Sequence, residues 1–118
     1  MSRSTNDVFE DYLALRMHGG VEGDIVRNYA DDIVILSGDG SFRRHDGVRT
    51  SAKMLEKRLP KARLSYRSKL VDGDVAFLEW SAESPSGRVD DGTDTFVIRD
   101  GKIAVQTIHY TVRPLDPK

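Results

Sequence analysis

The segment DTFVIRDGKI, residues 94–103, carries the strongest fold signal in the chain. At its centre is the dipeptide Asp100-Gly101, which is typical of a tight β-hairpin turn. Apolar and polar residues alternate over residues 93–99 before the dipeptide, and a β-branched run over residues 103–112 follows it. The sequence therefore predicts two antiparallel strands joined at Asp100-Gly101.

The same period of two continues toward the N-terminus. Residues 64–71 and 75–83 each alternate in this way, and the turn sequence Asp72-Gly73-Asp74 lies between them. We expect a long loop over residues 84–92, which connects this hairpin to the next. The second half of the chain thus predicts a four-stranded antiparallel meander.

The first half shows helical spacing instead. From Val8 onward, apolar residues recur at intervals of three and four until Gly19-Gly20, after candidate capping residues at positions 4–6. A shorter helix fits residues 21–29. The chain therefore begins with two helices separated by a pair of glycines.

A strand and a third helix complete the first half. The β-branched run at residues 33–36 predicts a strand that enters a turn at residues 37–40. The next helix has its apolar face over residues 48–59, ends before Pro60, and has Asp46 as its expected cap. Helices first and strands second predict an α+β domain.

Composition narrows the possible classes of protein. The 118 residues, of which 38% are hydrophobic, suffice for one core, so we expect a single domain over residues 1–118. The net charge of −1 and the lack of a long apolar run predict a cytoplasmic protein that binds neither nucleic acid nor a membrane. The chain has no cysteine, its three histidines lack metal-ligand spacing, and no phosphate-binding glycine motif is present. We therefore expect no metal and no cofactor.

Five motifs follow one another in a recognisable order. A first helix that contains Tyr12 precedes NYADDIVIL at 28–36, FRRHDGVR at 42–49, DVAFLEW at 74–80 and DTFVIRDGKI at 94–103. This succession resembles the nuclear transport factor 2-like superfamily, especially its SnoaL-like and ketosteroid-isomerase-like branches, over nearly the whole chain.

The resemblance implies a particular architecture. Three N-terminal helices would pack on a strongly curved, mostly antiparallel sheet, which forms a cystatin-like cone with an internal pocket. It also implies a homodimer formed through the convex sheet face. The apolar residues that we expect on that face are Val75, Phe77, Val97, Ile103 and Val105.

Strand parity predicts which side chains point into the cone. The set that contains Trp80 is fully apolar and should face the helices. The large side chain of Phe96 likewise places Asp94 on the inner face. On the last strand both faces are half apolar, and the resemblance puts Gln106 inward and His109 outward. A shift by one residue would instead bring His109 beside Asp94.

Asp94 is the most informative of these residues, because desolvation disfavours an ionised carboxyl group on an apolar face. Either Asp94 lies at a hydrated end of the cone or beside a local donor, or it acts on a ligand as a proton donor or hydrogen-bonding group. The resemblance to ketosteroid-isomerase-like proteins implies the second role. Asp94 falls at the acid of their oxyanion hole, and Tyr12 falls at or within one residue of the partner tyrosine.

The general base of those isomerases has no counterpart here. Ser37 stands at its position, and a serine does not abstract a carbon-bound proton unaided. A steroid isomerase is therefore not expected. Asp39 is a candidate proton carrier if the turn around it folds over the pocket, and His45 is either a second candidate or a rim residue.

The resemblance, together with the strand parity, implies a pocket for a small hydrophobic organic ligand. One hypothesis is a cofactor-free isomerase, dehydratase or cyclase that moves a proton on a carbonyl-containing substrate. The alternative is a non-catalytic ligand-binding or dimeric association module. Residues 49–69, with eight Lys or Arg and one Glu, are either a solvated helix face or an anion site. Beside Asp94, Tyr12 and Gln106, the expected pocket residues are Tyr29, Leu36, Ser37, Tyr66, Leu78, Trp80, Phe96, Ile108 and Tyr110.

Overall fold

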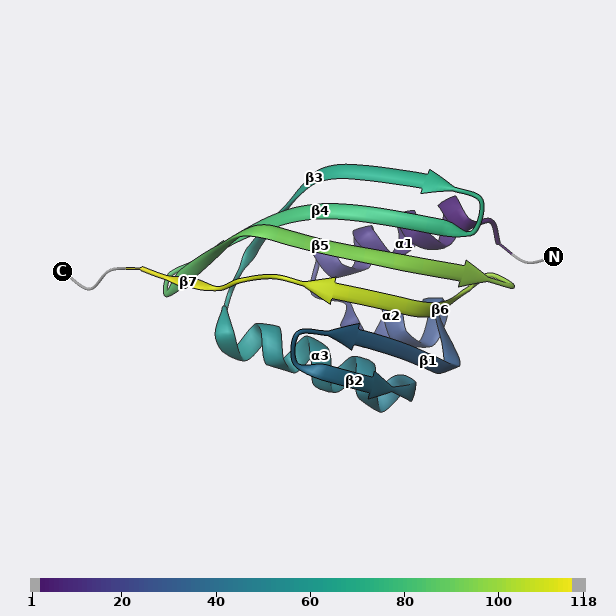
Figure 1. Ribbon diagram of the computed structural model, residues 1–118, viewed down its shortest axis with the longest axis horizontal. Helices are drawn as coiled ribbons and strands as arrows, with labels where there is room; N and C mark the ends of the chain where they lie inside the picture. Colours follow the sequence, from purple (N-terminus) through teal and green to yellow (C-terminus); the bar gives the residue numbers. More distant parts are fainter. Residues whose placement is uncertain (1–2, 116–118) are drawn as a thin grey trace.

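The computed structural model describes residues 3–115 and contains three helices and seven strands (Figure 1). The helices are α1 (Thr5–Met17), α2 (Val21–Asn28) and α3 (Arg44–Arg58). The strands are β1 (Tyr29–Ser37), β2 (Gly40–Arg43), β3 (Arg63–Asp72), β4 (Val75–Ser84), β5 (Gly87–Arg99), β6 (Lys102–His109) and β7 (Arg113–Pro114).

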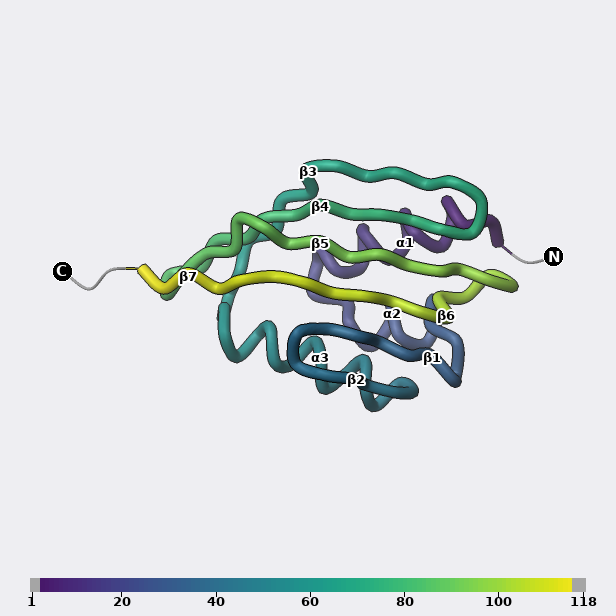
Figure 2. The backbone as a smooth tube through the Cα atoms, in the orientation of Figure 1, coloured from purple at the N-terminus to yellow at the C-terminus, as the bar shows by residue number. Residues whose placement is uncertain are grey.

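The strands form one sheet with the order β2-β1-β6-β5-β4-β3, and β7 pairs with β5 at one end. Among these described strands, only the β1–β6 pair is parallel. The three helices cover one face of this curved sheet, and the path of the chain from β3 through β6 is the predicted meander (Figures 1 and 2). The predicted fold class, three helices on a curved and mostly antiparallel sheet, is confirmed.

Local chemistry explains where the first helix begins and ends. The Ser4 hydroxyl accepts a hydrogen bond from the Asp7 backbone N–H, and the Asp7 carboxylate accepts one from the Ser4 N–H, which together make a capping box. After the helix, Gly19 adopts a φ of +75°, a conformation that suits glycine and stops the helix. Ser4, within the predicted candidates, is the cap.

Several expected boundaries are wrong. β1 begins at Tyr29 and not at residue 33, β6 ends at His109 and not at residue 112, and β2 was not expected. Asp46 does not cap α3, which begins at Arg44; Asp46 lies in its first turn and accepts a hydrogen bond from Arg49. The loop expected over residues 84–92 is mostly strand, because β5 already begins at Gly87. The β4–β5 hairpin extends beyond the helices there, so most of its side chains are polar on both faces and the alternation is faint.

The predicted inner face is confirmed on β4 and β5. Ala76, Leu78, Trp80 and Ala82 are buried, as are Asp94, Phe96 and Ile98. Gln106 is also buried on β6, whereas His109 is exposed.

Ile103 is a correction to the predicted outer face, because it is fully buried. The register shifts by one residue between Val97, which pairs with Val105, and Ile98, which pairs with Ile103. Such a β-bulge reverses the parity on one side of it, so Ile103 points inward and Val105 outward.

Candidate functional site

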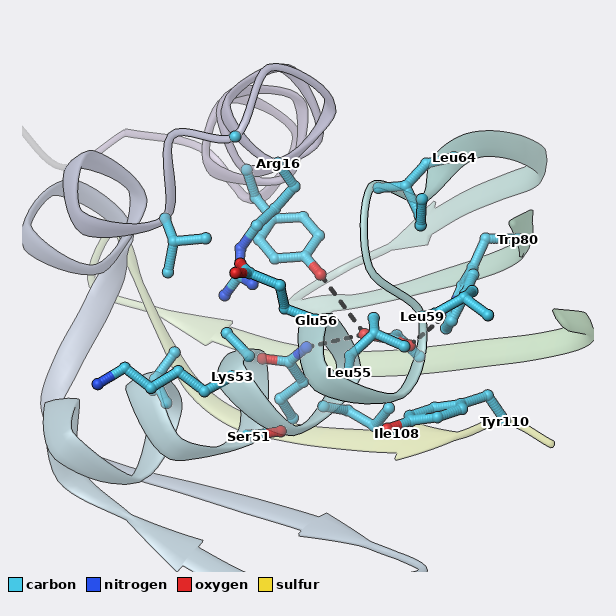
Figure 3. Close-up of a pocket in the computed structure, with 18 of the residues that line it drawn as sticks. Arg16, Ser51, Lys53, Leu55, Glu56, Leu59, Leu64, Trp80, Ile108 and Tyr110 are labelled. Atoms are coloured by element: carbon cyan, nitrogen blue, oxygen red, sulfur yellow. Dashed lines mark hydrogen bonds between the residues drawn. The ribbon is translucent and has the colours of Figure 1, made fainter. Parts of the chain in front are cut away.

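The helices and the inner sheet face enclose a pocket of about 720 Å³ (Figure 3). One wall comes from α1 and the C-terminal half of α3, and the opposite wall comes from the inner faces of β3, β4, β5 and β6. Leu55, Leu59, Leu64, Leu78 and Ile108 make much of its surface apolar. A pocket of this size suits a small organic molecule.

Asp94 lies at the sheet side of this pocket and is the centre of its polar contacts. Its Oδ1 accepts a hydrogen bond from the Trp80 indole Nε1 at 2.9 Å, and its Oδ2 accepts one from the Gln106 Nε2 at 2.8 Å. The Tyr12 hydroxyl is 3.5 Å from Oδ2, a distance at the limit of a hydrogen bond. These contacts, drawn as dashed lines in Figure 3, fix the carboxyl plane while leaving Tyr12 loosely engaged.

Burial controls the acidity of both groups. Desolvation raises the pKa of Asp94 above its ordinary value, although the hydrogen bonds from Trp80 and Gln106 oppose this shift. Desolvation, followed by the nearby Asp94 charge, raises the pKa of Tyr12 well above its ordinary value. Tyr12 therefore remains a neutral hydrogen-bond donor, and Asp94 is a stronger base than an exposed aspartate.

A second polar row lies behind Asp94. The Tyr29 hydroxyl donates to Gln106 Oε1 at 2.6 Å, which orients the amide so that its nitrogen faces Asp94. Arg16 in turn donates from Nη2 to the Tyr29 hydroxyl at 3.3 Å and from Nε to Asp24 Oδ2 at 2.6 Å. The sheet side of the pocket is thus held by a continuous hydrogen-bonded chain from α2 to β5.

Tyr66 and Tyr110 occupy two other parts of the lining. The Tyr66 hydroxyl donates to the Leu13 carbonyl at 2.7 Å, and burial raises its pKa to about 12. Tyr110 packs against Trp80 with ring centroids 5.7 Å apart. Its hydroxyl accepts from Arg58, which also binds both oxygens of Asp39 at 2.8 Å.

The structure brings seven of the predicted site residues to one pocket. They come from α1, from the four strands β3 to β6, and from the residue that follows β6. They are Tyr12, Tyr66, Trp80, Asp94, Gln106, Ile108 and Tyr110. Leu78, also expected as a wall, joins them.

The other predicted residues do not line the pocket, and two of them lie just behind its wall. Tyr29 is buried and reaches Asp94 only through Gln106. Phe96 is buried beneath Tyr12, with the two ring centroids 4.8 Å apart. Both residues position lining side chains by packing and hydrogen bonding.

The two residues expected as proton carriers, Asp39 and His45, also lie outside the pocket. The Asp39 carboxylate is held at the rim by Arg58, and that hydrogen bond lowers its pKa. His45, at the start of α3, directs Nε2 to the Tyr29 carbonyl at 3.0 Å. The Ser37 hydroxyl accepts from the Asp39 N–H, and Leu36, expected as a wall, is 49% exposed.

Sequence reasoning missed the lining residues of α3 and of the segment that follows it, such as Leu55 and Leu59. It also missed Arg16 in the lining and Gly92, which packs against Trp80. Arg16 stands four residues after Tyr12 on α1, so helical spacing places both on the same face and is the signal that could have found it. Gly92 pairs with Trp80 across β4 and β5, and a Cβ atom there would lie 2.3 Å from the indole ring. No sequence signal marks Gly92, because Trp80, the residue that it packs against, is 12 residues away along the chain.

The basic stretch at residues 49–69 does not form one surface. Arg49 pairs with Glu22 and Asp46, and Lys69 pairs with Glu10. Lys53, Lys57 and Lys61 instead line the pocket. Within residues 3–115, no group of three or more His, Asp or Glu side chains is placed to hold a metal ion, and no helix is long and apolar enough to cross a membrane.

Known families and structures resemble this chain along most of its length. A model of the SnoaL-like domain matches residues 9–106. A proposed SnoaL-like polyketide cyclase from Mesorhizobium loti superposes with a TM-score of 0.71 at 15% identity, covering 92% of this chain and 100% of that one. A proposed ketosteroid isomerase from Kribbella flavida superposes with a TM-score of 0.76 at 15% identity, covering 97% of this chain and 82% of that one.

A designed protein with a curved β-sheet has the same fold as well, with a TM-score of 0.76 at 22% identity and coverage of 94% and 88%. No curated protein matches the sequence. The structural similarities, all at low identity, establish the shared cone-shaped fold.

Proposed function

This chain belongs to the SnoaL-like domain family, and we propose that its pocket binds a small carbonyl-containing organic molecule and that Asp94 transfers a proton on it. One observation carries the proposal: a buried carboxyl group and a neutral tyrosine hydroxyl, 3.5 Å apart, face the same apolar pocket. Buried pairs of titratable groups with altered pKa values are typical of acid–base sites.

The chemistry follows from where the two groups lie. Asp94 Oδ2, whose basicity is raised by burial, accepts a proton from the carbon next to the carbonyl group. Tyr12 donates a hydrogen bond to the carbonyl oxygen as negative charge develops on it. Return of the proton from Asp94 to a different carbon gives isomerisation. Its transfer to a departing hydroxyl group releases water and gives dehydration, and its transfer to the oxygen of a second carbonyl that the enolate carbon attacks gives cyclisation. Asp94 takes over the proton-carrying role expected of Asp39 or His45, since neither lines the pocket.

The test uses 2-tetralone, a ketone with exchangeable protons next to its carbonyl group. We expect the protein to accelerate exchange of these protons in heavy water, followed by proton NMR. Asp94→Asn keeps the shape of the side chain but removes the base, and should slow exchange by about 100-fold or more. Asp91→Asn, an exposed carboxylate on the same strand, is the matched control and should exchange like the wild type.

Non-catalytic ligand binding is the second candidate, and a specific observation favours it. Both oxygens of Asp94 already accept hydrogen bonds from nitrogen donors, as expected of a carboxylate that only orders a pocket. Binding of 2-tetralone by calorimetry without any exchange above that of Asp94→Asn would reject proton transfer and support this candidate.

A further inference from the structure

Arg16 is a cationic side chain of the pocket wall whose hydrogen-bonding capacity is only partly used. Its Nε and Nη2 bind Asp24 and Tyr29, but Nη1 has no hydrogen-bond partner within residues 3–115. No fully buried side-chain nitrogen or oxygen in that range lacks a partner. Nη1 is therefore open to solvent, and Arg16 lines the pocket (Figure 3).

The guanidinium group is also held in place. It lies over the Tyr12 ring at 5.2 Å from the centroid and over the Tyr29 ring at 6.0 Å. The Asp24 carboxylate that anchors it is fully buried and is fixed in turn by Asn28 at 2.7 Å. A fixed, planar guanidinium binds a carboxylate with little loss of side-chain freedom.

The charges around the pocket favour an anion. Lys53, Lys57 and Lys61 line it together with Arg16, and the acidic side chains among the lining residues are Glu56 and Asp94. None of the three lysines forms an ion pair in the part of the chain that the structure describes. Their charges therefore add to the attraction that Arg16 exerts.

We propose that the natural ligand is an organic carboxylate, whose anionic group binds Arg16 while its apolar body extends toward Asp94. This inference rests on the proposed small-molecule pocket and names the substrate class. The Tyr12 side chain sets the geometry, since Arg16 lies over its ring and Asp94 lies at its hydroxyl end. Arg16 and Asp94 thus lie at different parts of the same tyrosine side chain, so that one ligand can contact both.

A pair of probes that have nearly the same size and shape, one anionic and one neutral, tests the proposal. They are 4-phenylbutanoate and its primary amide, 4-phenylbutanamide, at about pH 7.5, where a carboxylic acid is ionised. Trp80 is the single tryptophan of the chain and lines the pocket, so its fluorescence reports occupancy. Excitation at the red edge of the indole absorption avoids the phenyl ring. We expect the carboxylate to bind at least about fivefold more tightly than the amide.

Three variants assign that preference to Arg16. Arg16→Gln combined with Asp24→Asn removes both charges of the buried pair, so neither is left unpaired, and should abolish the preference. Asp24→Asn alone removes the carboxylate that already binds Arg16 within the protein, and it should increase the preference for the carboxylate probe over the amide. Arg27→Gln removes an exposed arginine that pairs with Asp11 outside the pocket, and should leave it unchanged. Circular dichroism and thermal melting verify that each variant is folded.

Each outcome decides a separate point. Equal affinity of the wild type for acid and amide overturns the anion inference but leaves the small-molecule pocket standing. A folded double variant that keeps the preference shows that Arg16 is structural and overturns the assignment. Failure of both probes to change the Trp80 signal or to bind by calorimetry counts against the pocket proposal and the inference together.

Discussion

The Asp94 carboxyl group combines two opposing effects at a single residue. Its burial disfavours the charged form, whereas the N–H groups of Trp80 and Gln106 favour it. The net result is a raised pKa, and with it a base that is both oriented and more reactive than an exposed aspartate. Tyr29, although outside the pocket, contributes by fixing the Gln106 amide.

The raised pKa of Asp94 predicts how the stability of the protein depends on pH. The folded protein holds this proton to higher pH than the unfolded chain does. The resulting stabilisation is complete below the unfolded pKa, near 4, and is lost as pH rises through the folded pKa. Asparagine does not titrate, so the stability of the wild type relative to Asp94→Asn, measured by urea denaturation, should fall as the pH rises above about 4.

A carboxylate with the opposite shift serves as the control. The Thr111 N–H lowers the pKa of Asp91, which is exposed on the same strand. Relative to Asp91→Asn, the stability of the wild type should therefore rise with pH up to about the unfolded pKa near 4 and stay level above it. If the stability of the wild type relative to Asp94→Asn also rises with pH, the hydrogen bonds to Asp94 outweigh its burial, and its pKa is lowered and not raised.

At the scale of elements, the pocket depends on close packing between β4 and β5. The register of this pair shifts beyond Trp80, where Ser81 alone stands opposite Asp90 and Asp91. The shift places Gly92 beneath the indole ring, where only a residue without a Cβ atom fits. The indole ring of Trp80 therefore packs directly against β5, and its N–H group donates a hydrogen bond to Asp94.

Gly92→Ala should therefore lower the stability of the protein and displace Trp80 in the pocket. We expect a loss of about 1–3 kcal/mol in the free energy of unfolding, because the added methyl group overlaps a buried ring, and a shift in Trp80 fluorescence. Gly38→Ala is the matched control, since its Cβ meets nothing within 4 Å and the site is exposed, and it should change stability by less than about 0.5 kcal/mol. Equal effects of the two changes would contradict the packing argument.

At the scale of the whole molecule, the outer face of the sheet, which the helices leave uncovered, carries a row of apolar side chains that crosses four strands. Val34, Val105, Val97 and Val75 are register partners across four neighbouring strands, and Phe77 lies beside them. We propose that a second copy of the chain covers this outer row and forms a homodimer. A hollow domain of this size gains stability from such burial.

Phe77→Glu places a charge in the middle of that face and should convert the dimer into a monomer, as measured by size-exclusion chromatography with light scattering. Val26→Glu, which changes an exposed residue on α2 away from the sheet, should leave the dimer intact. A wild type that is monomeric at all accessible concentrations would refute the dimer.

The sequence by itself determined the order and type of the three helices and of the long strands, and the inner face of β4 and β5. Its signals were local, because alternation, helical spacing and turn residues act between near neighbours in the chain. For that reason the parity of Phe96 is enough to place Asp94 on the inner face, and helical spacing is enough to place Tyr12 on the first helix.

Only the tertiary structure decided which side chains share the pocket. The bulge that turns Ile103 inward, the contact of Gly92 with Trp80, and the Arg58 hydrogen bonds that hold Asp39 at the rim all join residues distant in sequence. Arg16 likewise becomes a site residue only because the packing of α1 lets it line the pocket, while Asp24 and Tyr29 leave its Nη1 without a hydrogen-bond partner within residues 3–115. Local patterns fix which way a strand faces, whereas packing between elements fixes what each side chain meets.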